Sequence, residues 1–383
     1  MNSQSTRSWA VLLVSILLIT ACQKSINETA VPQADETASK NVKSVKHFSV
    51  RNLVANVAGY GAEKIDPTLR NPWGLAWSGT GTAWTGSQAG HVSNVYDSIG
   101  NPNAALNPVA IPSPVAATGG NPTGVVFNGG TGFLIPPNSS SSTATTPARF
   151  IFVGVDGVLS AWSGGWGKFA YRKAVLPGAF TGLAINTFNG NTYLYAANFA
   201  TRNIDVWNSS WAAVPEATMP FTDPQLPAGY APFNIEPVGN QLYVTYAKVG
   251  GDGRSEHAVG LGYVSIFTTD GQFVRRFASG GELNAPWGIA KAPASFYRDE
   301  DSDAGDAILV GNFGDGRILA YRASDGKFLG QLSNKKVPIV IDGLWAIGFA
   351  PASSPISKDI LYFTAGPNHE MDGLFGYIKR LQD

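Results

Sequence analysis

The segment 366–373 carries the densest set of side chains that could do chemistry. It reads G-P-N-H-E-M-D-G, so His369, Glu370 and Asp372 lie within four residues of one another. An imidazole and two carboxylates at this spacing could form an acid–base pair or supply nitrogen and oxygen ligands to a cation. A hydrophilic loop between two strands has much the same composition. The segment alone therefore leaves a functional and a structural interpretation open.

The short motifs typical of catalysis are missing from the sequence. It contains no G-x-S-x-G elbow, Walker loop, H-E-x-x-H or C-x-x-C motif. It has four histidines and one cysteine, so a multi-histidine metal site is not expected, and disulfides and cysteine-based metal sites are excluded. The residues themselves therefore predict no cofactor and do not decide whether the chain is an enzyme.

Six internal repeats indicate which elements must position the candidate residues. Each repeat is anchored in a short run such as N-P-W-G-L-A-W (71–77) or A-P-W-G-I-A-K (285–291). The anchors are spaced by 50, 58, 52, 54 and 58 residues, and they are Trp73, Thr123, Thr181, Phe233, Trp287 and Trp345. Near-regular periods of this size with strand-like content are typical of propeller blades.

Each repeat shows the same order of strand-like runs. A second run follows the anchor, as at 242–246 and 308–312, and a third run ends in an aromatic residue. Only six residues follow Tyr377 in the last repeat, whereas residues 47–57 read as a strand that precedes the first repeat. We therefore predict an all-β fold over residues 47–383, a six-bladed β-propeller whose last blade is closed by the N-terminal strand.

A propeller would gather the candidate site residues on one face. The loops that enter the inner strands and those that leave the second strands surround the central channel there, where the surface is concave. A pocket of aromatic and polar side chains at this place suits a sugar-like or amphipathic small molecule. The alternative is that the tryptophans pack between blades and the asparagines hold turns. The candidate binding residues are Trp73, Phe233, Trp287, Trp345, Asn198, Asn312, Asp342, Asn368, His369 and Glu370.

The runs N-P-W-G-L-A (71–76), A-P-W-G-I-A (285–290) and G-N-F-G-D-G-R-I (311–318) resemble a family of uncharacterised bacterial secreted propeller proteins. More loosely, the repeats are similar to NHL-type six-bladed propellers, a group that includes binding modules, lactonases and lyases. Similarity to the lactonases implies a Ca²⁺ ion held by Asn, Asp and Glu around the channel. The candidate ligands for that ion are Asn198, Asn312, Asp342 and Glu370.

The N-terminus predicts export. Arg7 and the free amine precede an apolar run at 9–19 that is too short to span a bilayer. The run ends in I-T-A-C at 19–22, which resembles the lipobox of bacterial lipoproteins. We expect a signal peptide at 1–21, then a lipidated Cys22 and a flexible tether over 22–46. Because Gln23 rather than Asp follows the cysteine, we expect attachment to the outer membrane, on its periplasmic side or at the cell surface.

Charge and closure limit the expected partners. Lys+Arg and Asp+Glu are equal at 27 each, so the sequence predicts no nucleic-acid partner and no membrane contact other than the lipid anchor. A closed ring is expected to be a monomer. The sequence thus favours a lipid-anchored extracytoplasmic module that binds an unknown small molecule or protein. The alternative is a Ca²⁺-dependent, lactonase-like hydrolase or lyase with its site at the central channel.

Overall fold

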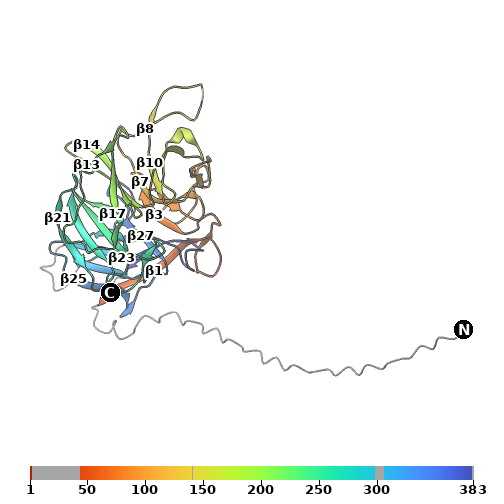
Figure 1. The fold of residues 1–383 in the computed structure, drawn as a ribbon. Helices are drawn as coiled ribbons and strands as arrows, with labels where there is room; N and C mark the ends of the chain where they lie inside the picture. Colours follow the sequence, from red (N-terminus) through yellow and green to blue (C-terminus); the bar gives the residue numbers. More distant parts are fainter. Residues whose placement is uncertain (2–43, 140, 298–305, 382–383) are drawn as a thin grey trace. The chain divides into compact units, whose positions relative to one another are not determined.

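The folded part of the chain is built almost entirely of β-strands. The computed structural model describes Met1 and residues 44–139, 141–297 and 306–381 (Figure 1). The chain divides into units of residues 1–41 and 42–383, and the strands belong to the second unit. The helical structure that is described is a 3₁₀ turn at Gly164–Trp166. Among the described residues, no helix has the length and hydropathy needed to cross a membrane. Cys22 lies outside them.

Four sheets contain four or five strands each. In chain order, the first comprises β3 (Pro72–Trp77), β4 (Ala83–Ser87), β5 (Val92–Tyr96) and β6 (Val109–Ala110). The second comprises β7 (Pro122–Phe127), β10 (Phe150–Gly154), β11 (Val158–Trp162) and β12 (Tyr171–Val175). The third comprises β13 (Phe180–Phe188), β14 (Asn191–Asn198), β15 (Asn203–Asn208) and β16 (Ala213–Val214). The fourth comprises β17 (Tyr230–Val238), β18 (Gln241–Val249), β19 (Ser255–Glu256), β20 (Tyr263–Thr268) and β21 (Phe273–Ser279).

The fifth and sixth repeats share one ten-stranded sheet. Its main path runs β22 (Pro286–Ala292), β23 (Ala307–Asn312), β24 (Ile318–Arg322), β25 (Phe328–Asn334), β1 (Ser44–Ala55), β29 (Leu374–Arg380), β28 (Ile360–Ala365) and β27 (Leu344–Phe349). Two short strands pair at its side, β2 (Lys64–Ile65) with β1 and β26 (Val337–Pro338) with β25. A separate two-stranded ribbon consists of β8 (Leu134–Ile135) and β9 (Thr146–Pro147).

Strand β1 joins the two ends of the folded unit. It pairs antiparallel with β29, from Phe48 opposite Arg380 to Ala55 opposite Leu374, and parallel with β25 near Ser44. The strand begins at Ser44, three residues before the predicted start at 47. This is the pairing that closure by an N-terminal strand requires, because it covers the outer edge of β29.

Local sequence explains the strands and their turns. The second strands β4 and β10 are buried along their whole length, as expected of strands covered on both faces. Asn189 and Gly190 both have positive φ, 48° and 77°, the geometry of a type I′ turn between β13 and β14. Apolar side chains from neighbouring sheets then form shared cores. For example, Trp84 stacks on Phe150 with ring centroids 4.1 Å apart.

The innermost strands form a closed ring. Each of β3, β7, β13, β17, β22 and β27 contacts the next, and β27 contacts β3. Glycines make this approach possible, because a Cβ added at Gly74 would lie 2.5 Å from the carbonyl oxygen of Thr123. One added at Gly124 would lie 2.6 Å from the backbone nitrogen of Leu183. Figure 1 shows the sheets arranged around this common centre. The predicted all-β propeller is confirmed.

Candidate functional site

A large cavity lies at the end of the ring where the inner strands begin. We call it the top cavity; its volume is about 950 Å³. The loops that enter the inner strands and the turns that follow the second strands line it, together with the segment between β18 and β20. Its lining residues with aromatic or ionisable side chains are Trp73, Phe199, Phe233, Phe313, Trp345, Asp252, Arg254, His257, Asp342, His369 and Glu370.

An aromatic cluster forms the base of the top cavity. The Trp345 indole lies between Trp73 and Phe313, with ring centroids at 3.5 Å and 3.8 Å and nearly parallel planes. Trp287 packs edge-on against Trp345 at 5.8 Å, and Phe233 lies 5.9 Å from the same ring. Offset-stacked and edge-on arrangements are the favoured geometries of aromatic pairs. The rings therefore pack with one another, and all of them except Trp287 also line the cavity.

The indole N–H groups of this cluster differ in their partners. Trp345 Nε1 donates to Asn71 Oδ1 at 2.9 Å, and Trp287 Nε1 donates to the backbone oxygen of Thr181 at 3.0 Å. Trp73 Nε1 is buried and has no hydrogen-bond acceptor among the described residues. A buried donor without an acceptor is unfavourable.

A polar chain connects the rim of the cavity with its base. Glu370 accepts from Arg254 Nη2 at 2.5 Å through one carboxylate oxygen and from Asn71 Nδ2 at 2.9 Å through the other. Asn71 in turn accepts from the Trp345 indole. The Arg254 side chain is 70% exposed, whereas that of Glu370 is 21% exposed. Glu370 thus connects the exposed guanidinium group of Arg254 at the rim, through Asn71, to the buried aromatic base.

The turn that presents Glu370 is strained. Asn368, His369 and Glu370 have φ of 57°, 53° and 66°, so three consecutive non-glycine residues are left-handed. This conformation costs about 1–2 kcal/mol per residue for L-amino acids. Hydrogen bonds hold the turn, since Asp342 Oδ2 accepts from Asn368 N at 2.9 Å and Gly366 O accepts from Glu370 N at 3.1 Å. Strain of this kind is concentrated at functional sites.

The rim also carries an imidazole. His257 packs edge-on against Phe313 with centroids 4.9 Å apart, and its Nε2 lies 3.0 Å from Ser255 Oγ. Partial burial lowers the pKa of His257, and the charge of Arg254 lowers it further. The neutral imidazole is therefore favoured, in which one ring nitrogen donates a hydrogen bond and the other accepts one.

Asn198 and Asn312 hold turns rather than line the cavity. Asn198 Oδ1 accepts from the backbone nitrogens of Ala179 and Thr201, at 3.1 Å and 3.3 Å. Its amide group donates to Asp205 Oδ2 at 2.8 Å. Burial raises the pKa of Asp205, although the hydrogen bond from Asn198 acts in the opposite direction. The turn held in this way presents Phe199 to the cavity.

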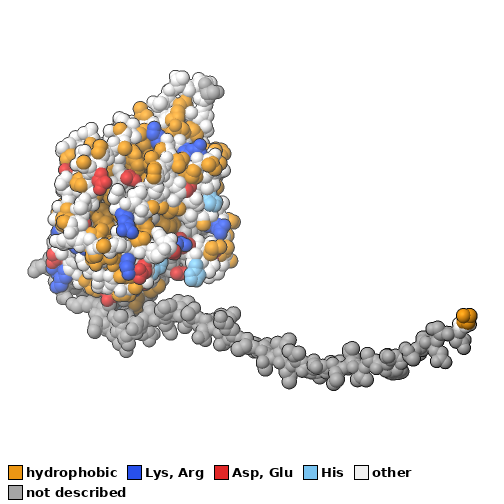
Figure 2. All heavy atoms as spheres, viewed as in Figure 1, with side chains coloured by type: hydrophobic (Ala, Val, Ile, Leu, Met, Phe, Trp, Pro, Cys, Tyr) orange, Lys and Arg blue, Asp and Glu red, His pale blue; other side chains and the backbone are white. Residues whose placement is uncertain are grey.

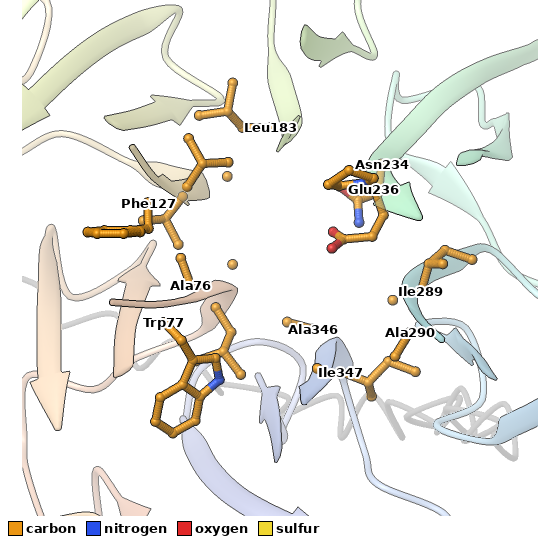
Figure 3. A pocket seen from close by; sticks show the side chains of 18 of the residues that line it. Ala76, Trp77, Phe127, Leu183, Asn234, Glu236, Ile289, Ala290, Ala346 and Ile347 are labelled. Atoms are coloured by element: carbon orange, nitrogen blue, oxygen red, sulfur yellow. The ribbon is translucent and has the colours of Figure 1, made fainter. Parts of the chain in front are cut away.

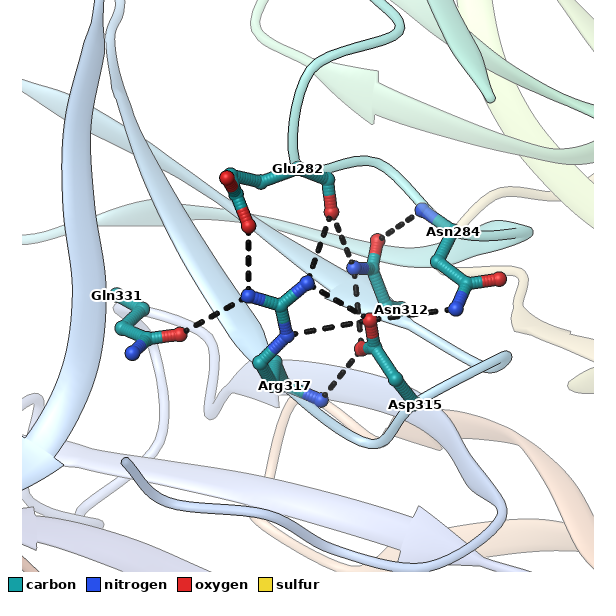
Figure 4. A network of polar contacts seen from close by, with 6 residues as sticks. All are labelled: Glu282, Asn284, Asn312, Asp315, Arg317 and Gln331. Carbon is teal, nitrogen blue, oxygen red and sulfur yellow. Dashed lines mark hydrogen bonds and ion pairs between the residues drawn. The ribbon is translucent and has the colours of Figure 1, made fainter. Parts of the chain in front are cut away.

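The corresponding turn after β23 is held by a larger network (Figure 4). Asn312 Oδ1 accepts from the backbone nitrogen of Asn284 at 3.1 Å, and its amide group donates to Asp315 Oδ1 at 3.1 Å. Arg317 pairs with Asp315 at 2.9 Å and with Glu282 at 2.7 Å. This network fixes the turn that presents Phe313 to the cavity.

The structure brings together part of the predicted set. Trp73, Phe233, Trp345, Asp342, His369 and Glu370 line the top cavity. Asn198, Asn312 and Asn368 are not among its lining residues, and Trp287 lines a different pocket. Within the part of the chain that the structure describes, no group of three or more His, Cys, Asp or Glu is placed to hold a metal ion.

Sequence reasoning missed Arg254, Phe199 and Phe313. A signal for the two phenylalanines was present, because the second strand ends in an asparagine that a phenylalanine follows, at 198–199 and at 312–313. Arg254 has no counterpart in the other repeats. It lies in the segment between β18 and β20, which contains the additional strand β19.

Comparisons with known proteins give relatives over most of the chain. No family model matches. The uncharacterised proteins R648 and L690 of Acanthamoeba polyphaga mimivirus are 32% identical over 353 residues and 31% identical over 360 residues. Each alignment covers 89% of this chain, with 82% of R648 and 88% of L690. The resemblance to bacterial secreted propellers stays a prediction beside these viral relatives.

Solved structures bear on the fold alone. A structural genomics protein of unknown function from Bacteroides thetaiotaomicron has a TM-score of 0.52 at 12% identity, over 87% of this chain and 76% of that chain. A streptogramin B lyase has a TM-score of 0.46 at 13% identity, over 87% of this chain and 97% of that chain. On the sequence relationships, the chain belongs to the family that includes the mimivirus proteins R648 and L690.

Proposed function

We propose that the chain is a six-bladed β-propeller that binds an amphipathic, sugar-like small molecule in its top cavity. One observation supports this most directly. A cavity of about 950 Å³ has an aromatic base and a rim of charged and amide side chains. Ligand sites commonly combine apolar walls with a few polar groups that fix the orientation of the ligand. The count of six blades is supported by the ring of inner strands, with β1 as the outer strand of the last blade.

The chemistry of the lining suggests how such a ligand would lie. Its apolar face would pack on Phe313 and on the small exposed part of Trp73. Its hydroxyl groups would meet Glu370, Arg254 and the neutral imidazole of His257 at the rim. The charges of Glu370 and Arg254 balance each other, so this pair requires no charged ligand, while Asp252 and Asp342 add acidic groups to the lining.

The Ca²⁺-dependent alternative makes a different demand. It needs Asn198, Asn312, Asp342 and Glu370 to converge on one ion, whereas the carboxamide oxygens of Asn198 and Asn312 accept from backbone nitrogens of the loops that enter β13 and β22. Elemental analysis of the purified protein, paired with melting curves with and without EDTA, separates the two proposals. Bound Ca²⁺ and a melting temperature that falls on chelation would support the metal-dependent alternative.

The binding proposal is tested by tryptophan fluorescence, because Trp73 and Trp345 are at the base of the cavity. Titration with a panel of neutral oligosaccharides should give saturable changes for at least one member. Phe313→Leu and Glu370→Gln should each weaken that binding by about tenfold or more. Phe169→Leu and Glu216→Gln are matched controls at exposed positions outside the cavity and should bind as the wild type does. Equal affinity in all four variants, or no saturable response to the panel, would overturn the proposal.

The cellular location is proposed from sequence alone. The lipobox-like run that ends at Cys22 supports export and lipid anchoring. When the wild-type chain is expressed in a Gram-negative bacterium, it should be found in the outer-membrane fraction and should incorporate labelled fatty acid. Cys22→Ser should abolish labelling and release the protein into the soluble fraction. Labelling that persists in the variant would contradict lipidation at this residue.

A further inference from the structure

A second pocket lies at the opposite end of the ring, where the inner strands end. We call it the bottom pocket; its volume is about 340 Å³. The C-terminal halves of the inner strands line it on all sides (Figure 3). Its walls are largely apolar, with side chains from Ala76, Val126, Leu183, Ile289 and Ile347.

Glu236 on β17 is the one acidic residue among those that line this pocket. Figure 3 shows its carboxylate pointing into the pocket, near Asn234 on the same strand. No described residue donates a hydrogen bond to this carboxylate or forms an ion pair with it, and Asn234 directs its amide group to the backbone oxygen of Trp287 at 2.9 Å. The Glu236 side chain is partly exposed at the wall of the pocket, and an ionised carboxylate held among apolar side chains without a partner is less stable than one fully surrounded by water. The pocket therefore contains an acidic group whose counter-charge the chain does not supply.

The other charged group that lines the bottom pocket does not supply a counter-charge to Glu236. Glu236 and Lys291 are the ionisable residues among those that line the pocket. Lys291 Nζ forms an ion pair with Asp306 at 2.6 Å, and both side chains are about half exposed. Burial raises the pKa of Glu236 to about 8. A positive ligand group beside Glu236 would favour the ionised form and would reverse that shift.

We propose that the bottom pocket binds a small organic ammonium ion, whose apolar body contacts the aliphatic walls while its charged group pairs with the Glu236 carboxylate. Two favourable effects combine in this arrangement. The apolar body removes aliphatic surface from water, and the ammonium group supplies the missing counter-charge. A metal cation fits less well, because the pocket offers one carboxylate and few further oxygen ligands.

The bottom pocket is separate from the top cavity. The aromatic cluster lies between them, with Trp287 on the side of the bottom pocket and Trp73 and Trp345 on the other side. Trp287 packs edge-on against both, with centroid distances of 6.5 Å and 5.8 Å. The proposal therefore does not depend on the function proposed for the top cavity.

The test uses the full-length protein and two probes of the same shape, cyclohexylammonium and cyclohexanol. Calorimetric titration should show that cyclohexylammonium binds with one site and at least about tenfold more tightly than cyclohexanol. Its affinity should rise as the pH increases from 6 to 8 and then level off, because Glu236 must ionise to pair with it. Cyclohexanol should show no such rise.

Variants test whether the Glu236 carboxylate causes the preference for cyclohexylammonium and its dependence on pH. Glu236→Gln should reduce cyclohexylammonium affinity by at least about tenfold and abolish its pH dependence, whereas cyclohexanol should bind as before. Glu216→Gln, at an exposed glutamate outside the pocket, is the matched control and should bind as the wild type does. Melting curves establish that both variants are folded. Absent binding at millimolar concentration, equal affinity of the two probes, unchanged affinity in Glu236→Gln, or affinity that falls with pH would each overturn the proposal.

Discussion

A carboxyl group surrounded by aliphatic side chains stabilises the fold only while it keeps its proton. Glu236 lines the aliphatic bottom pocket with its side chain partly exposed, and desolvation there raises its pKa to about 8 from the ordinary value of 4.5. Between these pH values the folded state binds a proton that the unfolded state has released. The contribution of Glu236 to stability is therefore fully present below about pH 4 and is lost as the pH rises through about 8.

Replacing Glu236 by Gln should remove this dependence on pH. Because glutamine stays neutral, Glu236→Gln should melt close to the wild type near pH 4 and several degrees higher at pH 9. The measurement is the difference in melting temperature between the two proteins across this range. Glu216→Gln serves as the control for loss of a surface carboxylate. A difference that stays constant or shrinks with rising pH would show that Glu236 ionises freely in the folded state.

At the same scale, residue type alone could not assign roles to the candidate residues. Asn198 and Asn312 fit a channel ligand and a turn equally well, and only the backbone nitrogens beside them decide between the two. Glu370 fits either a solvated loop or a site, and its role depends on Arg254, which is 116 positions away in sequence. The sequence did not indicate a role for Glu236, because whether its side chain faces the bottom pocket depends on the register of β17.

At the scale of elements, the recurring glycine of the inner strands has a steric explanation. Successive inner strands approach so closely that an added Cβ at Gly288 would lie 2.7 Å from the backbone oxygen of Trp345. In β17 the equivalent position is Asn234, whose side chain instead bonds to Trp287 on the next strand. In β27 the equivalent position is Ala346, so anchor and glycine serve the same contact in four of the six repeats. The repeat spacing therefore predicted the strands well. The segment of β19 and Arg254 lies outside the repeat and could not be placed.

A methyl group on an inner glycine should weaken the ring. In Gly74→Ala the new Cβ would meet Thr123 O at 2.5 Å and Val125 N at 2.9 Å, and these backbone atoms cannot move freely. We expect the free energy of unfolding to fall by about 1–3 kcal/mol. Gly348→Ala on β27 is the matched control, because no atom lies within 4 Å of its added Cβ, and it should be neutral or slightly stabilising. Denaturant titrations of both variants give the values. Equal stability of the two would show that inner strands can separate without cost.

At the scale of the whole molecule, the two features to compare with the sequence are the distribution of surface charge and the closure of the ring by β1. Figure 2 shows acidic and basic side chains scattered among apolar and uncharged ones over the visible face. This agrees with equal numbers of Lys+Arg and Asp+Glu in the sequence. Closure was predictable, because the last repeat lacked residues for an outer strand while the N-terminal region had one to spare. That β1 would also pair with β25 was not, since it depends on the residues before the predicted start.

The ring should fail to close without β1. Phe48 on this strand is fully buried and packs on Phe296, and Leu53 and Val54 are almost fully buried. A chain of residues 57–383 would therefore lose part of two cores and would expose the edges of β25 and β29, which are then free to pair with other chains. We expect this chain to aggregate or to melt without cooperativity, whereas residues 42–383 should remain monomeric and melt cooperatively. Size-exclusion chromatography with light scattering and thermal denaturation compare the two. Adding a peptide of residues 44–56 to the shortened chain should restore the monomer, because the peptide supplies the missing strand. A shortened chain that is monomeric and stable without the peptide would show that the remaining strands close the ring unaided.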